Sequence, residues 1–267
     1  MKKTVIGIIA VLFSSIFLIP SEAATPKALV IIDSYFDSKV YNTNVTCATL
    51  SNVVCTDVVT KKVRSLSDDV NHGNAMAEVA KKQNPELSII LLRAGNASKN
   101  SVSGVNAGDF INALLWVQAN QSKVGAVSIS RHFTGNQGCS PAATNTAAYG
   151  GIIKADNTIR ALILSLKKVG IPVFASTGNT LGTKIGYPGC ILDTVSVSVG
   201  ETNSQGVIIS NRAFNGDTDY LASSSINSYE SSILGLIAQT TSSGTAAVAA
   251  QWMTAGNLAS KVVMVNP

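Results

Sequence analysis

Short apolar runs that alternate with helix-like segments constrain the fold of this chain more than any other feature of its sequence. Most of these runs are continuously apolar, whereas valine and serine alternate at 195–199, and we interpret all five as strands buried on both faces of a sheet. They lie at residues 28–32, 88–92, 124–129, 173–175 and 195–199. Helices are predicted between them at 74–82, 109–119 and 157–169. This order predicts an α/β fold of three layers, with a mostly parallel central sheet and helices on both faces.

The ends of these segments carry residues suited to their positions. Asp109 is a candidate N-cap, and Gly170 follows the last predicted turn of 157–169 as a stop. Asp33, Ser130 and Asn179 follow predicted strands. In parallel sheets, ligand sites form at the carboxyl ends of strands, so these residues are candidates for a site.

The N-terminus has the pattern of a secretory signal peptide. Lys2 and Lys3 precede an uncharged run at 5–20, and Ser21-Glu22-Ala23 supplies a cleavage site. We expect residues 1–23 to be the signal and residues 24–267 to form a single domain, secreted or periplasmic, without stable membrane insertion after signal removal. The alternative is an uncleaved membrane anchor, for which the apolar run is short.

Four cysteines, an even number, follow this signal: Cys47, Cys55, Cys139 and Cys190. In an exported chain an even count favours disulfides. Of the three possible pairings, we favour Cys47 with Cys55 and Cys139 with Cys190. A zinc site is the alternative, but the chain has no C-x-x-C pair and little histidine.

The charge of the chain gives little information about partners. The net charge of +5 becomes +4 without Lys2, Lys3 and Glu22, because two positive charges and one negative leave with the signal. There is no dense block of Lys and Arg, so the sequence does not indicate nucleic-acid binding.

Three separated segments each supply a different catalytic group. Asp33 ends an apolar run, His72 begins a stretch of small residues, and Ser242 precedes the small-residue segment 243–250. Only two histidines exist, and one lies where a base is required. Singly, each residue also has a purely structural interpretation: a loop cap, a helix start, and one polar residue in a Ser/Thr-rich stretch.

Together these segments resemble the subtilisin-like serine peptidases, whose triad has the same chain order of Asp, His and Ser. The resemblance extends along nearly all of the mature chain. The matching stretches are Val30-Ile31-Ile32-Asp33-Ser34, His72-Gly73, Ala126-Val127-Ser128-Ile129-Ser130, Thr177-Gly178-Asn179, Tyr187-Pro188-Gly189 and Thr241-Ser242.

The resemblance implies a role for each matched residue. Ser242 would attack a peptide carbonyl, His72 would accept and return the proton, and Asp33 would orient His72. Asn179 and the Ser242 backbone N–H would face the oxyanion.

A substrate-binding wall is implied by the same resemblance. It would consist of Ser130, Arg131, His132 and Gly178. One hypothesis gives Arg131 and His132 a preference for acidic or polar substrate side chains. The alternative is that His132 is a polar residue covering a strand end.

Several positions depart from the family pattern. Tyr35 and Thr240 replace glycines, Asn74 replaces a threonine, and Gly244 weakens the first turn of the helix that would carry Ser242. No propeptide is expected, since the signal is followed within a few residues by the first strand. After Ser242 we expect one helix through about Met253 and an edge strand at 261–265.

The predicted function is an exported serine endopeptidase with a polypeptide substrate. The alternative is a catalytically inactive subtilase-like protein that binds a peptide or a protein partner. A third class, an unrelated α/β protein, would be favoured if His72 lay out of reach of both Asp33 and Ser242. The chemistry requires no cofactor, and no clustered acidic loop indicates a calcium or other metal site.

Overall fold

The computed structural model describes residues 26–33, 36, 45–48, 72–98, 101–105, 107–130, 139, 150–179, 184–202, 208–211, 218–225, 241–260 and 262–264. The segment that carries the predicted signal peptide lies outside these residues. In the described part of the chain, no helix has the length and apolar character needed to cross a bilayer.

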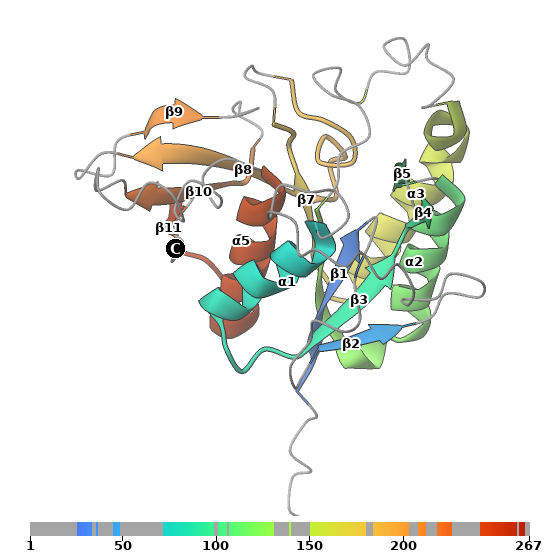
Figure 1. The fold of residues 1–267 in the computed structure, drawn as a ribbon, viewed down its shortest axis with the longest axis horizontal. Coiled ribbons are helices and arrows are strands. Elements are labelled where there is room, and N and C mark those ends of the chain that lie inside the picture. The colour runs from blue at the N-terminus through green and yellow to red at the C-terminus, as the bar shows by residue number, and fades with distance from the viewer. Residues whose placement is uncertain are drawn as a thin grey trace, which may run out of the picture.

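A large sheet forms the centre of the molecule (Figure 1). Within the described residues it has nine strands, ordered β11-β10-β8-β7-β6-β1-β3-β2, with β9 paired to β8. All neighbours pair in parallel except β8 and β9. The strands are β1 (Ala28–Asp33), β2 (Val45–Ala48), β3 (Ile89–Arg93), β6 (Val124–Ile129), β7 (Val173–Ser176), β8 (Val195–Thr202), β9 (Ile208–Asn211), β10 (Tyr220–Ser225) and β11 (Val262–Met264).

Helices cover both faces of this sheet, as predicted. They are α1 (His72–Gln83), α2 (Ala107–Ala119), α3 (Gly150–Lys168) and α5 (Thr241–Ala255), with a 3-10 turn at Gln121–Lys123. A separate antiparallel pair is formed by β4 (Gly95–Ser98) and β5 (Ser101–Val105). The predicted α/β fold with a mostly parallel sheet is therefore confirmed.

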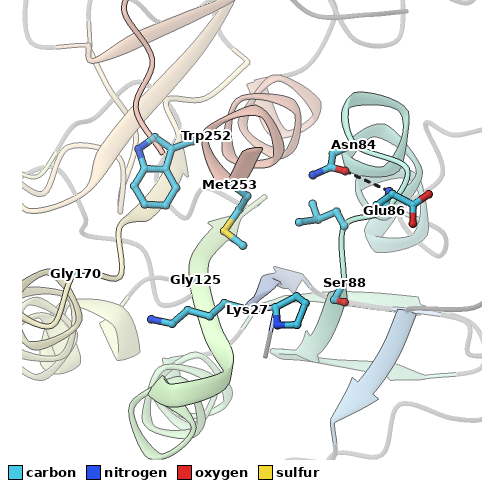
Figure 2. Close-up of a pocket in the computed structure, with 10 residues that line it drawn as sticks. Lys27, Asn84, Glu86, Ser88, Gly125, Gly170, Trp252 and Met253 are labelled. Atoms are coloured by element: carbon cyan, nitrogen blue, oxygen red, sulfur yellow. Dashed lines mark hydrogen bonds between the residues drawn. The ribbon is translucent and has the colours of Figure 1, made fainter. Parts of the chain in front are cut away.

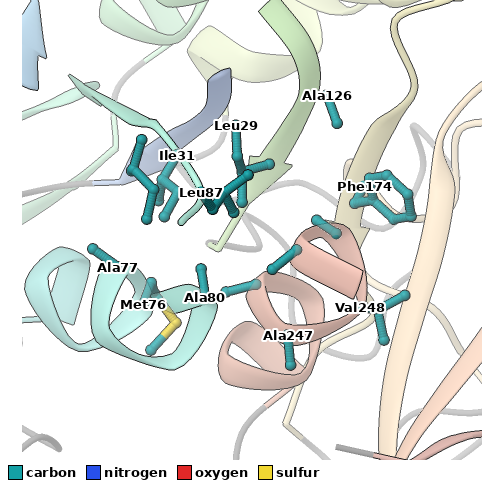
Figure 3. Packing of buried hydrophobic residues seen from close by; sticks show 14 of the residues in the cluster. Leu29, Ile31, Met76, Ala77, Ala80, Leu87, Ala126, Phe174, Ala247 and Val248 are labelled. Atoms are coloured by element: carbon teal, nitrogen blue, oxygen red, sulfur yellow. The ribbon is translucent and has the colours of Figure 1, made fainter. Parts of the chain in front are cut away.

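Side-chain alternation along β1 divides the core into two layers. Leu29 and Ile31 pack with α1 and α5, whereas Val30 and Ile32 pack with α2 and α3. Figure 3 shows the first layer, in which small residues of α5 face the sheet. Because successive strand residues point to opposite faces, β1, β3, β6 and β7 contribute to both layers, whereas the valines of β8 belong to the first layer alone.

The predicted element positions agree with the structure, apart from some ends. Each of the five predicted strands corresponds to one of β1, β3, β6, β7 and β8. Gly170 has φ +79° and its N–H donates to the carbonyl of Lys167, so the predicted helix stop is confirmed. Asp109 is not the N-cap, because α2 begins at Ala107 and places it in the first turn. Similarly, α3 begins at Gly150 rather than near residue 157.

One of the two favoured disulfides joins distant parts of the chain. Cys139 and Cys190 are bonded, with Cα atoms 5.6 Å apart and a sequence separation of 51. The prediction for this pair is confirmed. The Cys47–Cys55 pairing remains a prediction, because Cys55 lies outside the described residues.

Candidate active site

Asp33 and His72 meet at the carboxyl edge of the sheet. Asp33 is the last residue of β1 and is fully buried, and His72 is the first residue of α1. The His72 Nδ1 atom lies 2.6 Å from Asp33 Oδ2, across 39 residues of sequence. The side chain of His72 keeps 13% of its surface exposed. A buried carboxylate therefore holds one imidazole nitrogen, while the ring retains access to solvent.

Ser242 lies in the first turn of α5, as predicted. It is the second residue of the helix and is 4% exposed. The positive end of the helix dipole favours negative charge at this position. Helix α1 packs beside α5, which brings the starts of both helices toward the carboxyl edge (Figure 1). Among the described residues, no hydrogen bond joins Ser242 to His72.

Asn179 contacts the residue that precedes Ser242. Its Oδ1 atom accepts two hydrogen bonds from Thr241, one from the backbone N–H at 2.8 Å and one from the hydroxyl at 3.1 Å. Because Oδ1 is held by Thr241, the amide nitrogen is the end of this side chain that can donate toward a bound group. Asn179 is therefore oriented by the start of α5.

Gly178 completes this connection. Its backbone has φ +105°, a conformation that L side chains rarely adopt, and its N–H donates to Thr241 Oγ1 at 3.1 Å. The chain can thus turn directly after β7 and present Asn179 to α5. Thr241 matches the family pattern in sequence but has no role that the sequence predicts, and only the three-dimensional contacts show that it orients Asn179.

The predicted substrate-binding wall is only partly within the described residues. Ser130 directly follows β6 and is fully buried, and its backbone N–H donates to the carbonyl of Ile32 at 3.3 Å. Arg131 and His132 lie outside the described residues. The Cys139–Cys190 bridge ties the chain that follows β6 to the loop before β8.

Gly244 has a packing role that the sequence analysis missed. A Cβ atom at this position would lie 2.3 Å from Val199 Cγ1 and 3.0 Å from Ala222 Cβ. Strands β8 and β10 therefore approach α5 too closely for any side chain at this point. Glycine has a lower helix propensity than most other residues, but its missing side chain lets the start of α5 pack closely against the sheet.

Tyr187 lies buried in the loop between β7 and β8, with 5% of its surface exposed. Burial raises the pKa of its phenol above the ordinary value, and the neighbouring Asp156 carboxylate raises it further. Asp156 in turn pairs with Arg160 at 2.7 Å. The phenol is therefore held in its neutral form beside Asp156 of α3.

A pocket of about 430 Å³ opens elsewhere, at the amino ends of the strands. Figure 2 shows Trp252 and Met253 from the end of α5 above Lys27 and Gly125. Neither Asp33, His72, Asn179 nor Ser242 lines it. In the described residues, no three His, Cys, Asp or Glu side chains gather as a metal site would require.

Comparison with known proteins finds similarity in structure and not in sequence. No family model matches the chain, and no curated protein matches it. Among solved structures, the prenylagaramide maturation protease PagA matches with a TM-score of 0.55 and 12% identity, over 88% of this chain and 79% of that one. A mutant of the protease domain of PatA matches with a TM-score of 0.55 and 11% identity, over 89% and 85% of the two chains.

A third similar structure is the epidermin leader peptide processing serine protease EpiP of Staphylococcus aureus. It matches with a TM-score of 0.51 and 15% identity, over 85% of this chain and 64% of that one. At such identities the likeness concerns the fold. The chain therefore has a subtilisin-like protease fold, and the resemblance seen in the sequence is confirmed at that level.

Proposed function

We propose that this protein is an exported serine endopeptidase that hydrolyses polypeptides with Asp33, His72 and Ser242. The observation that carries the proposal is the 2.6 Å contact of His72 with the buried Asp33. An unrelated α/β protein would have been favoured only if His72 lay out of reach of both Asp33 and Ser242, and His72 is within hydrogen-bond distance of Asp33. The fold shared with PagA, PatA and EpiP supports a peptidase.

The reaction would begin at Ser242. Its hydroxyl oxygen attacks the peptide carbonyl, and its proton passes to His72 Nε2. Asp33 holds Nδ1 of the same ring, which leaves Nε2 as the nitrogen that would accept the serine proton. The proton then passes to the leaving amine, and a water molecule releases the acyl group through the same two side chains.

The negative charge that develops on the carbonyl oxygen would be stabilised at the start of α5. The Asn179 amide nitrogen and the Ser242 backbone N–H are the proposed donors. Thr241 holds the amide oxygen of Asn179, so the donor end does not have to reorient when charge develops. The dipole of α5 contributes in the same direction.

The substrate class follows from the fold and from the names of the similar proteins. PagA and PatA are named as maturation proteases, and EpiP as processing a leader peptide. We assign a polypeptide substrate on this basis. The resemblance in sequence implies that Ser130, Gly178, Arg131 and His132 would form the substrate-binding wall. The N-terminal segment at 1–23 supports export to the periplasm or the medium.

A second candidate is a catalytically inactive relative that binds peptide. The observation in its favour is that Ser242 and His72 share no hydrogen bond in the described residues. In active sites without substrate, catalytic hydrogen bonds are often long and shorten only when substrate binds. The missing Ser242–His72 hydrogen bond therefore does not decide between the two candidates, and a direct test is needed.

Labelling with a fluorophosphonate probe distinguishes the two candidates. The probe reacts only with an activated serine, so we expect the mature wild type to be labelled and both Ser242→Ala and His72→Ala to be unlabelled. Ser243→Ala is the matched control, since it removes the neighbouring hydroxyl in the same helical turn, and it should still be labelled. An unlabelled wild type that is folded, with the Cys139–Cys190 disulfide intact, would contradict the peptidase and favour the binding protein.

A further inference from the structure

Three serine hydroxyls lie buried beneath the candidate site. Ser128 and Ser130 come from the end of β6, and Ser176 ends β7. All three residues are fully buried, and none of their hydroxyls makes a hydrogen bond within the part of the chain that the structure describes. A buried hydroxyl without a partner costs about 1–3 kcal/mol in mutational data, so three neighbouring ones call for an explanation.

Strand register places the three side chains together. Strands β6 and β7 pair Ser128 with Phe174 and Ile129 with Ala175, so the next pair along the parallel strands is Ser130 with Ser176. Neighbouring strands lie about 4.8 Å apart. Ser130 and Ser176 are therefore adjacent, and Ser128 lies one strand repeat below Ser130.

All three side chains also point to the same layer. Ala126 on β6 and Phe174 on β7 both belong to the core that packs with α1 and α5 (Figure 3). Since alternate residues of a strand share a face, Ser128, Ser130 and Ser176 face that layer as well. By the same reasoning Asp33 shares this face, because Leu29 and Ile31 belong to the same core.

Asp33 extends this group by one strand. Strands β1 and β6 pair Ile32 with Ile129, so Asp33 is the neighbour of Ser130 on the side away from Ser176. The carboxyl edge thus carries a polar row of Asp33, Ser130 and Ser176 across three strands. Thr177 and Ser198 are also buried without a hydrogen bond, but strand alternation places them on the opposite face.

We propose that Ser128, Ser130 and Ser176 bind one internal water molecule between the sheet and the start of α5. Buried waters are held by about three polar partners, and three hydroxyls on two adjacent strands supply that number. Each hydroxyl can donate or accept, so all three can adapt to one water molecule. This water is distinct from the reacting groups and would be present whether or not Ser242 is catalytic.

Urea unfolding of serine-to-alanine variants tests the proposal, and a Ser242→Ala background keeps the test independent of peptidase activity. Ser128→Ala, Ser130→Ala and Ser176→Ala should each lower the unfolding midpoint, because each removes a partner of the water molecule. The double variant Ser130→Ala/Ser176→Ala should lose less than the sum of its two singles, since the first change already weakens the water. Ser122→Ala, at an exposed position in the 3-10 turn Gln121–Lys123, is the control and should leave the unfolding midpoint at that of the Ser242→Ala background.

Midpoints that rise would overturn the proposal, because removing a hydroxyl that has no partner relieves a cost rather than creating one. Strictly additive losses would overturn it as well. A crystal structure of Ser242→Ala that resolves ordered waters gives the direct check. We expect a water within hydrogen-bond distance of at least two of the three hydroxyls. A direct Ser130–Ser176 hydrogen bond with no water between them would show the proposal to be wrong.

Discussion

Helix α5 connects two edges of the sheet that differ in kind. Its first residue, Thr241, meets Asn179 at the carboxyl edge, whereas Trp252 and Met253 near its end line the pocket at the amino edge. The carboxyl edge holds a buried acid in contact with an imidazole. The amino edge has about 430 Å³ of open space but none of these paired groups.

The described pocket and the candidate site therefore lie at opposite edges of the sheet. At the carboxyl edge two pairs of residues are held by hydrogen bonds shorter than 3.2 Å, His72 with Asp33 and Thr241 with Asn179. At the amino edge Lys27 and Glu86 also line a space, but no ion pair joins them in the described residues. Chemistry is indicated by side chains whose positions are determined together, which is why we assign function to the carboxyl edge.

Exchanging the acid for its amide should give the largest effect and would test this assignment most severely. Asp33→Asn keeps the shape of the side chain but presents the wrong hydrogen-bonding group to His72, so probe labelling of Ser242 should slow by about 10⁴-fold. Lys27→Met, at the amino edge, should label at the wild-type rate. Equal rates for Asp33→Asn and wild type would contradict a catalytic carboxyl edge.

Asn179→Asp should give the next largest effect and separates the two ends of this side chain. The carboxylate can still accept from Thr241, but it cannot donate to an oxyanion, so labelling should slow by about 10²–10³-fold. The free energy of unfolding should change by less than about 1 kcal/mol, since the contact with α5 remains. Asn179→Ala is the companion variant and should lose both labelling and stability. A large loss of stability in Asn179→Asp would show that Asn179 serves only to hold the helix.

The core of the fold was predictable because continuous apolar runs specify strands buried on both faces. Five strands and three helices could be read from local pattern and composition, whereas the position of Ser242 in the first turn of α5 was predicted from the family resemblance. Strand β10 could not, because its sequence Tyr-Leu-Ala-Ser-Ser-Ser carries no continuous apolar run. Its place next to β8 is determined by tertiary contacts, including the side of α5 that carries Gly244.

The candidate site was predictable residue by residue but not as a network. Asp33, His72 and Asn179 stood out because each has a distinctive chemical group at the end of an element. The orienting role of Thr241 could not be predicted, because its partner is 62 residues away in sequence. Likewise, Gly244 was interpreted from helix propensity alone, and the close approach of Val199 is visible only in three dimensions.

A pair of glycine substitutions compares the two ends of α5 directly. Gly244→Ala would place a Cβ atom 2.3 Å from Val199 Cγ1 in a fully packed layer, so the free energy of unfolding should fall by about 1–3 kcal/mol. Gly125→Ala at the amino edge would place a Cβ atom 2.6 Å from Met253 Cε and 2.7 Å from Met253 Sδ. These atoms form the flexible end of the Met253 side chain, which can move into the pocket. The cost of Gly125→Ala should stay within about 0.5 kcal/mol.

Chemical denaturation of both glycine variants gives these values. The double variant Gly244→Ala/Val199→Ala removes the clashing methyl group and should recover part of the loss, which distinguishes crowding from helix propensity. If Gly125→Ala proved the more damaging change, then the amino edge would be the more rigid of the two and the comparison would be reversed.

The smallest effect concerns pH and the loop that carries Tyr187. Because burial and the nearby Asp156 raise the phenol pKa above its ordinary value of 10.0, the unfolded chain loses this proton at lower pH than the folded chain does. The phenol therefore makes its full contribution to the free energy of unfolding below the ordinary pKa, and this contribution declines as the pH rises above about 10. Tyr187→Phe cannot ionise, so its stability should fall less steeply than that of the wild type between about pH 9 and pH 11. Urea unfolding at several pH values measures the two slopes, and parallel slopes would mean that the phenol ionises as readily in the folded loop as in the unfolded chain.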